Sequence, residues 1–314
     1  MKTPVLRPAI ESVLFGFERI GMVIRVAWLP LVVAIGLYVV SFGLLVGFAD
    51  VQGWKIETDG FDELFATVVG SAGLVTFFVL QSTILPLIVS LVLSCVYVAV
   101  TRASTVADYE PPSMPFYFAL GARELRYFAA RLLYGIIISI AGAIFLGLGF
   151  VAVAAGIAGA EALNGYAKAL TIAPAAALAL AAFFLWLWVS LRFIPVLPIA
   201  AVENRIDFGA AWNMTKGNFW RLAVSGLFFL TLLEGMVWAL LFLFFLPALI
   251  VLALIGGLLF SVAGPAGFLI IGLIVVVLLP AVIAIAAFTL AAEAAYPARL
   301  YAYLTDCGDR CKIY

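Results

Sequence analysis

Residues 73–100 read GLVTFFVLQSTILPLIVSLVLSCVYVAV, a run of 28 residues without one charged side chain. A helix needs roughly 20 apolar residues to cross the ~30 Å hydrocarbon layer of a bilayer, so this run is long enough to do so. An isolated strand would leave its backbone polar groups unpaired in lipid. The run therefore predicts a transmembrane helix.

Five further apolar runs of similar length occupy much of the remaining chain. The composition agrees, because 67% of the residues are hydrophobic and 11% are charged, whereas a soluble domain is about half apolar and about a quarter charged. We predict an all-α, polytopic bundle of six transmembrane helices, forming a single integral membrane domain over residues 1–314. The predicted spans are residues 26–48, 73–100, 132–158, 169–191, 222–250 and 267–291.

The cationic residues predict the orientation, because those near span ends are retained in the cytoplasm. Successive gaps between the spans lie on opposite sides of the membrane. Of the 17 lysines and arginines, 15 lie in the gaps and ends on one side, and only Lys55 and Lys168 lie in gaps on the other side. We expect a bacterial inner-membrane protein with both termini cytoplasmic and no cleavable signal peptide, since Glu11, Glu18 and Arg19 interrupt the first segment. Net charge is zero, so nothing points to nucleic acid. The other fifteen are Lys2, Arg7, Arg19, Arg25, Arg102, Arg123, Arg126, Arg131, Arg192, Arg205, Lys216, Arg221, Arg299, Arg310 and Lys312.

A similar segment leads from each cationic gap into a span. Aligning Gly21 with Gly217 places Arg25 on Arg221. The second copy has Leu125 in place of the glycine, so its elbow is either a turn or a continuous helix. We interpret these segments as interfacial elbow helices of parallel repeats, related by an axis along the membrane normal. Chance similarity between apolar segments is the alternative. The repeats would cover residues 10–100, 115–191 and 207–295.

The best-defined elbow comprises residues 207–222. Asp207 is a favourable helix N-cap, Gly217 is a favourable terminator, and Asn218 can cap the span that begins at Phe219. This pattern predicts a short helix, a sharp turn and a new helix.

Residues 116–132 form a second distinctive segment. At about 100° per residue, Phe118 and Phe128 share one helix face, whereas Arg123 and Arg126 share the other. This pattern predicts an amphipathic interfacial helix with its arginines on anionic headgroups; an ordinary connector is the alternative. We therefore expect membrane lipids with anionic headgroups as partners on the cytoplasmic face. The candidate headgroup contacts are Arg25, Arg123, Arg126, Arg131, Lys216 and Arg221.

Glu234, Gln81 and Glu293 are the candidate intramembrane polar residues. Glu234 lies about a dozen residues into its span, where an ionisable group costs at least ~2.5 kcal/mol unless it is paired, neutral or hydrated. We expect it to face protein or water, with Gln81 as its partner. A proton- or cation-coupling carboxylate and a protonated packing residue both fit. Glu293 is closer to the cytoplasmic surface, where Arg299 or Arg192 is its expected partner.

The sequence supplies little reaction chemistry. It has no histidine, which is the commonest general base and metal ligand. Cys307 and Cys311 are four residues apart, but two thiols without further ligands make a weak metal site. We therefore predict no enzymatic activity and no cofactor. The small residues from Ala175 to Ala182 instead predict close helix packing.

One segment carries a family resemblance. Arg192, Pro195 and Pro198 close the fourth span, Val202-Glu203 follows, and residues 211–222 form an Ala-Trp…Lys-Gly-Asn-Phe-Trp-Arg-Leu elbow. In these features the chain resembles the superfamily of glycerophosphoryl diester phosphodiesterase membrane domains and YciC-like integral membrane proteins. The resemblance implies a six-helix inner-membrane module that some relatives fuse to a soluble phosphodiesterase domain. That domain is missing here, so no catalytic residue carries over.

The sequence favours a non-enzymatic inner-membrane protein, acting as an accessory, scaffold or assembly component of a membrane complex. It would work with a membrane-protein partner or as a homo-oligomer. The alternative is a transporter or channel for a small or amphiphilic solute, with Glu234 and Gln81 along its path. An intramembrane enzyme acting on lipid is a third hypothesis.

Overall fold

The structure is a computed structural model that describes residues 6–51, 72–106, 109–111, 117–161, 166–262 and 266–305. Within these ranges the chain is almost entirely helical and contains no strand, which confirms the all-α prediction. The long helices are α2 (Ile20–Val51), α4 (Ala72–Thr105), α5 (Ala122–Glu161), α6 (Tyr166–Phe193), α9 (Phe219–Val262) and α10 (Ala266–Leu304); the shorter ones are α1 (Arg7–Glu18), α7 (Val196–Val202) and α8 (Phe208–Met214).

Each of the six long helices contains a stretch apolar and long enough to cross a membrane. The chain is therefore a multi-pass membrane protein. Every long helix extends beyond its predicted span, most of all α9 with 44 residues, because helical hydrogen bonding continues where the apolar run ends. At 1.5 Å per residue α9 is about 66 Å long. Proline does not end the helices, since Pro86, Pro247 and Pro280 all lie inside them.

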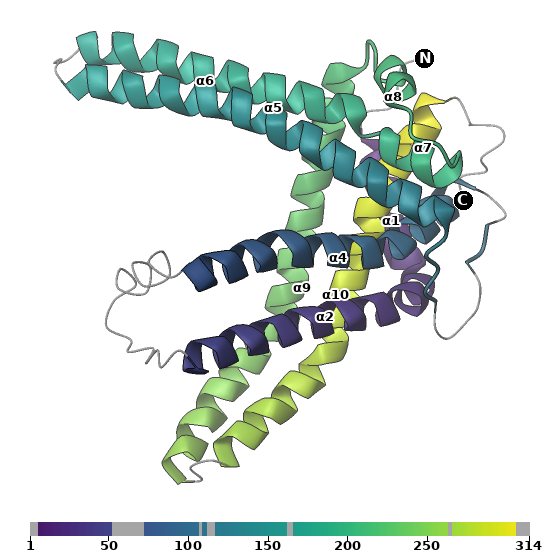
Figure 1. Cartoon of the computed structure of the whole chain (residues 1–314), viewed down its shortest axis with the longest axis vertical. Helices are drawn as coiled ribbons and strands as arrows, with labels where there is room; N and C mark the ends of the chain where they lie inside the picture. The colour runs from purple at the N-terminus through teal and green to yellow at the C-terminus, as the bar shows by residue number, and fades with distance from the viewer. Residues whose placement is uncertain are drawn as a thin grey trace.

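The long helices pair as antiparallel hairpins, α2 with α4, α5 with α6 and α9 with α10. Figure 1 shows the hairpins converging at one end of the molecule and diverging toward their loops, with α1, α7 and α8 gathered at the converging end. The α5–α6 hairpin extends away from the others as an arm. The predicted division into three repeats stays a prediction, because the hairpin arrangement alone does not establish equivalent units.

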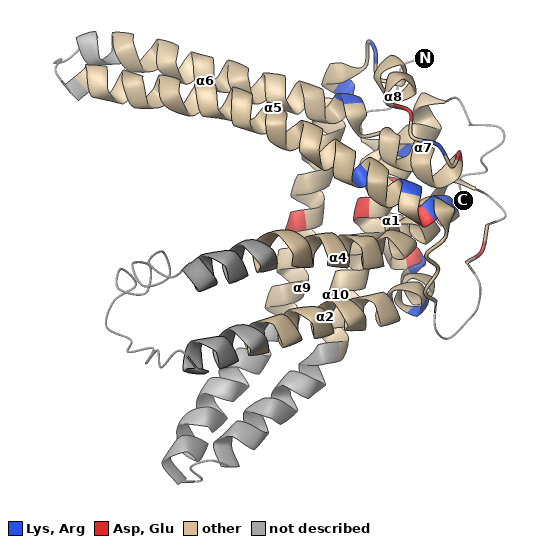
Figure 2. Ribbon diagram, in the orientation of Figure 1, with Lys and Arg blue, Asp and Glu red and all other residues tan. Residues whose placement is uncertain are grey.

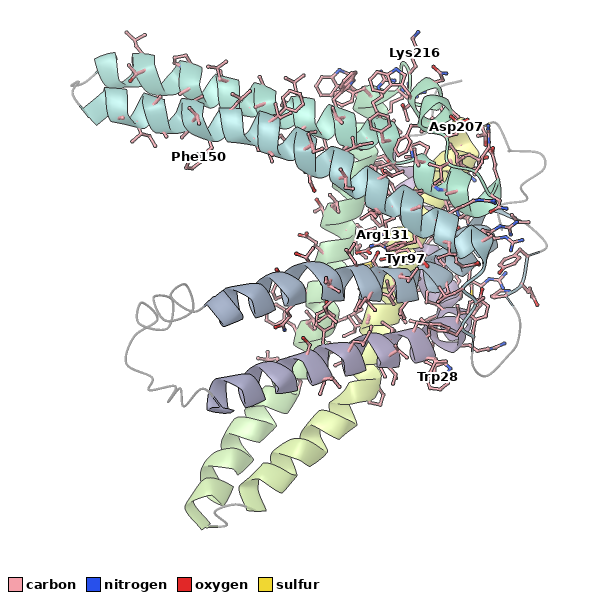
Figure 3. The ribbon with its side chains drawn as sticks, in the orientation of Figure 1. Trp28, Tyr97, Arg131, Phe150, Asp207 and Lys216 are labelled. Atoms are coloured by element: carbon pink, nitrogen blue, oxygen red, sulfur yellow. The ribbon has the colours of Figure 1, made fainter. Side chains whose placement is uncertain are left out.

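The hydrophobic core lies at the converging end. Its largest fully buried side chains come from α2, α4, α7, α9 and α10, and include Val23, Val96, Ile199, Leu222 and Phe288. The lysines and arginines whose side chains the structure describes gather at the same end (Figure 2). Along the diverging arms, large apolar side chains remain exposed; Phe150 on α5 is 75% exposed and points away from the hairpin (Figure 3). A lipid environment accepts such apolar surfaces.

Helices α5 and α6 pack closely through small residues. A Cβ atom added at Gly156 would lie 2.5 Å from the Ala175 Cβ, and one added at Gly149 would lie 3.2 Å from the Ala179 Cα. These contacts confirm that the alanine-rich run serves helix packing, because backbones can approach this closely only without larger side chains between them.

The predicted elbow at residues 207–222 is confirmed in most respects. The Asp207 carboxylate accepts a hydrogen bond from the Ala210 N–H at 2.8 Å and caps α8. Gly217 has a positive φ of 81°, as its terminating role requires. Asn218 immediately precedes α9 and accepts its first backbone hydrogen bond, from Leu222, at 3.0 Å.

Two other predictions about the elbows were wrong. The first elbow lies at Arg19, between α1 and α2, whereas Gly21 is inside α2. The separate interfacial helix over residues 116–132 is not present, because residues 117–121 are not helical. α5 continues from Ala122 through Leu125 into the span without a break, which confirms the continuous helix as the alternative for the second elbow. Local amphipathicity cannot distinguish a separate surface helix from the first turns of a longer helix. Phe116 lies outside the described residues.

Candidate functional site

Three long helices contribute to a polar cluster beside the core. The Tyr97 hydroxyl on α4 donates a hydrogen bond to the Glu293 carboxylate on α10, with an O–O distance of 2.9 Å. The Arg131 Nη2 on α5 donates to the same hydroxyl at 3.4 Å. The Arg131 guanidinium carbon lies 4.1 Å from the centroid of the Tyr97 ring, a cation–π contact. Figure 3 shows Arg131 and Tyr97 close together between α5 and α4.

Tyr127 supports this cluster from α5. Its ring stacks on Tyr97 with a centroid distance of 6.1 Å and an interplanar angle of 17°. Tyr127 and Tyr97 are both buried, so the aromatic surface under the Arg131 guanidinium is held in place by packing. Sequence reasoning missed both tyrosines. The signal that points to them is a phenolic hydroxyl near the cationic end of an apolar run, where a polar partner is required.

The Arg131 side chain makes few polar contacts for its hydrogen-bonding capacity. A guanidinium carries five N–H donors, yet Nη2 makes a long contact to Tyr97 and Nη1 is buried without a hydrogen-bond partner. No carboxylate among the described residues lies within 4.0 Å of Arg131. Glu293 reaches it only through the Tyr97 hydroxyl. The cluster therefore presents a cation with unfilled donors inside a membrane-crossing helix.

A cavity adjoins this cation between α4 and α5. Its volume is about 430 Å³, within the range of about 300–1,000 Å³ typical of small-molecule sites. Leu87 and Ser90 line it from α4, and Phe128, Arg131, Ser139 and Ile140 are among the residues that line it from α5. The cavity thus combines a mainly apolar wall with one guanidinium and two hydroxyl groups.

The predicted partners of Glu293 were wrong. Arg299 is 4% exposed and lies 4.0 Å from Glu11 on α1. Arg192 donates to the Trp212 carbonyl oxygen at 3.2 Å and lies over the Trp212 ring. The packing of α1 and α8 decided which groups these arginines meet.

Glu234 lies on the exposed face of α9, so within this chain it does not face protein; water, the other environment predicted for it, stays a prediction. Its exposed neighbours on that helix are apolar, with Leu230 54% and Trp238 59% exposed. Glu234 and Gln81 are not hydrogen-bonded to each other, and neither residue lines the cavity between α4 and α5. The predicted pair is therefore not formed within the described part of the chain.

The predicted headgroup cations occupy different environments. Arg25 and Lys216 are exposed. Arg126 is also exposed and donates to the Asn204 carbonyl oxygen at 3.1 Å. Arg123 is half-buried with its Nε unpaired, and Arg221 is half-buried and has a partner. Arg131 is the member of this set that lines a cavity.

A second charged cluster lies at the converging end of the molecule. Arg205 donates to Glu203 at 2.6 Å and to Asp207 at 2.9 Å, and Tyr301 on α10 donates to Glu203. The hydrogen bond to Glu203 and the charges of both carboxylates raise the pKa of Arg205. These groups satisfy one another and fasten the α7–α8 connection to α10. Cys307 and Cys311 lie outside the described residues.

Comparison with known proteins adds no relative to this description. No protein-family profile, curated protein or solved structure matches the chain. The resemblance to phosphodiesterase membrane domains stays a prediction.

Proposed function

We propose that this protein is a non-enzymatic accessory component of the bacterial inner membrane that assembles with another membrane protein, with both termini cytoplasmic. The observation that carries the proposal is the exposure of Glu234 on α9. A carboxyl group facing hydrocarbon costs at least ~2.5 kcal/mol even when the membrane adapts. A partner helix that offers it a hydrogen bond removes that cost.

The surroundings of Glu234 also suit a protein partner. Leu227, Leu230 and Trp238 are 68%, 54% and 59% exposed, so an apolar surface with an aromatic anchor flanks the carboxyl group. Helices associate in membranes through close packing and interhelical hydrogen bonds, and this face offers both. Little of α9 is used inside the chain, since 11% of its most apolar stretch is buried.

The transporter alternative requires a polar path that reaches Glu234. The cavity between α4 and α5 includes neither Glu234 nor Gln81. An intramembrane enzyme would need reactive groups that are free to meet a substrate, whereas the Tyr97 hydroxyl is already hydrogen-bonded to Glu293 and Arg131. These observations favour the accessory function over both alternatives.

The experiment is a mass measurement of the complex extracted from native membranes in mild detergent. We expect a mass above the 33.6 kDa of the single chain. Glu234→Leu should weaken the assembly about tenfold, the effect of losing one interhelical hydrogen bond in an apolar setting, whereas Glu234→Gln should retain it. Thr231→Val is the matched control, because the Thr231 hydroxyl already donates to the Leu227 carbonyl oxygen of its own helix at 2.9 Å.

Two results would count against the proposal. One is a chain that is monomeric at its native level of expression. The other is an assembly that Glu234→Leu and Thr231→Val affect equally, because the carboxyl group would then have no specific role.

A further inference from the structure

The cation beside the cavity lacks an anion. Arg131 lies in α5, nine residues past the start of that helix, and its nearest carboxylate is shielded by the Tyr97 hydroxyl that bonds both. A buried hydrogen-bond donor without a partner is costly, and Nη1 of Arg131 is such a donor. The protein therefore provides a binding group for an anion and does not itself supply the anion.

The shape of the cavity indicates what kind of molecule would carry that anion. On α5 the wall extends from Phe128 to Ile140, twelve residues or about 18 Å of helix. One leaflet is about half of the ~30 Å hydrocarbon layer, so the wall has the length of one leaflet. Arg131 is near the end of the wall that lies toward the gathered lysines and arginines, and Ile136 and Ile140 continue it toward the diverging end.

We propose that the cavity between α4 and α5 binds one anionic phospholipid from the leaflet at the cationic end of the protein. The lipid phosphate is held by Arg131 and one acyl chain lies along Leu87, Ile136 and Ile140. A free phosphate would use the guanidinium but leave the apolar wall empty, whereas an uncharged lipid would fill the wall but leave the guanidinium unpaired. An anionic phospholipid satisfies both parts of the site.

Tyr97 and Glu293 have a positioning role in this site. The Tyr97 ring lies under the guanidinium and its hydroxyl is fixed by Glu293 on α10. The long, flexible stem of Arg131 can turn the guanidinium toward an anion in the cavity while its contact with the ring is kept. Guanidinium groups bind phosphate through paired hydrogen bonds, which makes arginine the suitable cation here. The inference holds whether or not a protein partner covers Glu234.

The test titrates the purified full chain with phosphatidylglycerol or phosphatidylcholine of identical acyl chains and follows binding by native mass spectrometry. We expect the wild-type chain to bind one phosphatidylglycerol more tightly than phosphatidylcholine. Arg131→Gln should weaken phosphatidylglycerol binding about tenfold, as expected when hydrogen bonds to a charged group are lost, and should leave phosphatidylcholine binding unchanged. Arg25→Gln, an exposed cation away from the cavity, should leave the tight site intact.

A second variant tests the apolar wall without touching the polar cluster. Ile136→Trp places a larger side chain in the cavity and should weaken binding of both lipids. Leu133→Trp is its matched control, because Leu133 is on the same helix with nearly equal exposure, 43% against 46%, but does not line the cavity. Equal binding by wild type and Arg131→Gln, or by Ile136→Trp and Leu133→Trp, would overturn the proposal. So would binding of glycerol phosphate as tight as that of the complete lipid.

Discussion

Arg131 on α5 lies over the ring of Tyr97 on α4, 4.1 Å from its centroid, and donates to the hydroxyl of that same side chain. This contact joins the first hairpin to the second, and the hydrogen bond from Tyr97 to Glu293 extends the connection to the third. The three hairpins are thus linked through one tyrosine at the converging end of the molecule.

Tyr97→Phe should lower the free energy of unfolding by about 0.5–2 kcal/mol, because it removes a hydrogen bond between helices while keeping the ring under Arg131. Unfolding of the detergent-solubilised chain by denaturant measures this change. Tyr38→Phe is the control, since Tyr38 is 46% exposed on α2. Equal stability of the two variants would show that the hydroxyl of Tyr97 does not link the hairpins.

Gly156→Ala and Gly159→Ala should change stability in opposite directions, although both glycines are in α5. Alanine favours a helix over glycine by about 1 kcal/mol. At Gly159 nothing lies within 4 Å of the new Cβ, so the gain is kept, whereas at Gly156 the new atom would lie 2.5 Å from the Ala175 Cβ. Thermal unfolding of both variants tests this difference. Stabilisation by Gly156→Ala would contradict the close approach of α5 to α6 at Ala175.

Glu234→Gln should leave solute and proton flux unchanged, because we assign the carboxyl group to assembly and not to a transport path. The measurement uses the purified chain in vesicles with an imposed proton gradient and a pH-sensitive dye inside. Empty vesicles provide the baseline. A proton-dependent flux that is present in the wild type and lost in the variant would favour the transporter alternative instead.

A cysteine at Glu110 should remain unlabelled when intact cells are treated with a membrane-impermeant thiol reagent. Glu110 is exposed in the connection between α4 and α5, on the side that the cationic residues predict to be cytoplasmic. The variant requires replacement of Cys95, Cys307 and Cys311 by alanine. Labelling after permeabilisation is the positive control. Labelling of intact cells would show that the orientation is the opposite of the predicted one.

The sequence alone was enough to predict the six spans but not the partner of Glu293. The spans were predictable because each charged residue placed in hydrocarbon has its own free-energy cost. Membrane spans therefore appear in the sequence as long apolar runs without charge. The partner of Glu293 was not predictable, since Arg299 and Arg192 lie on faces that pack against α1 and α8. Which faces meet depends on how the hairpins are packed, and apolar helices pair with little sequence specificity.

The sequence by itself determined that this chain is helical, crosses the membrane and gathers its cations at alternate gaps, because these properties follow from local hydrophobicity and charge. The tertiary structure alone decided that Arg131 meets Tyr97 beside a cavity and that Glu234 is left on an outer face. The physical reason is that lipid solvates apolar helix surfaces as well as protein does. Only close packing and a few polar contacts therefore select one arrangement of the hairpins.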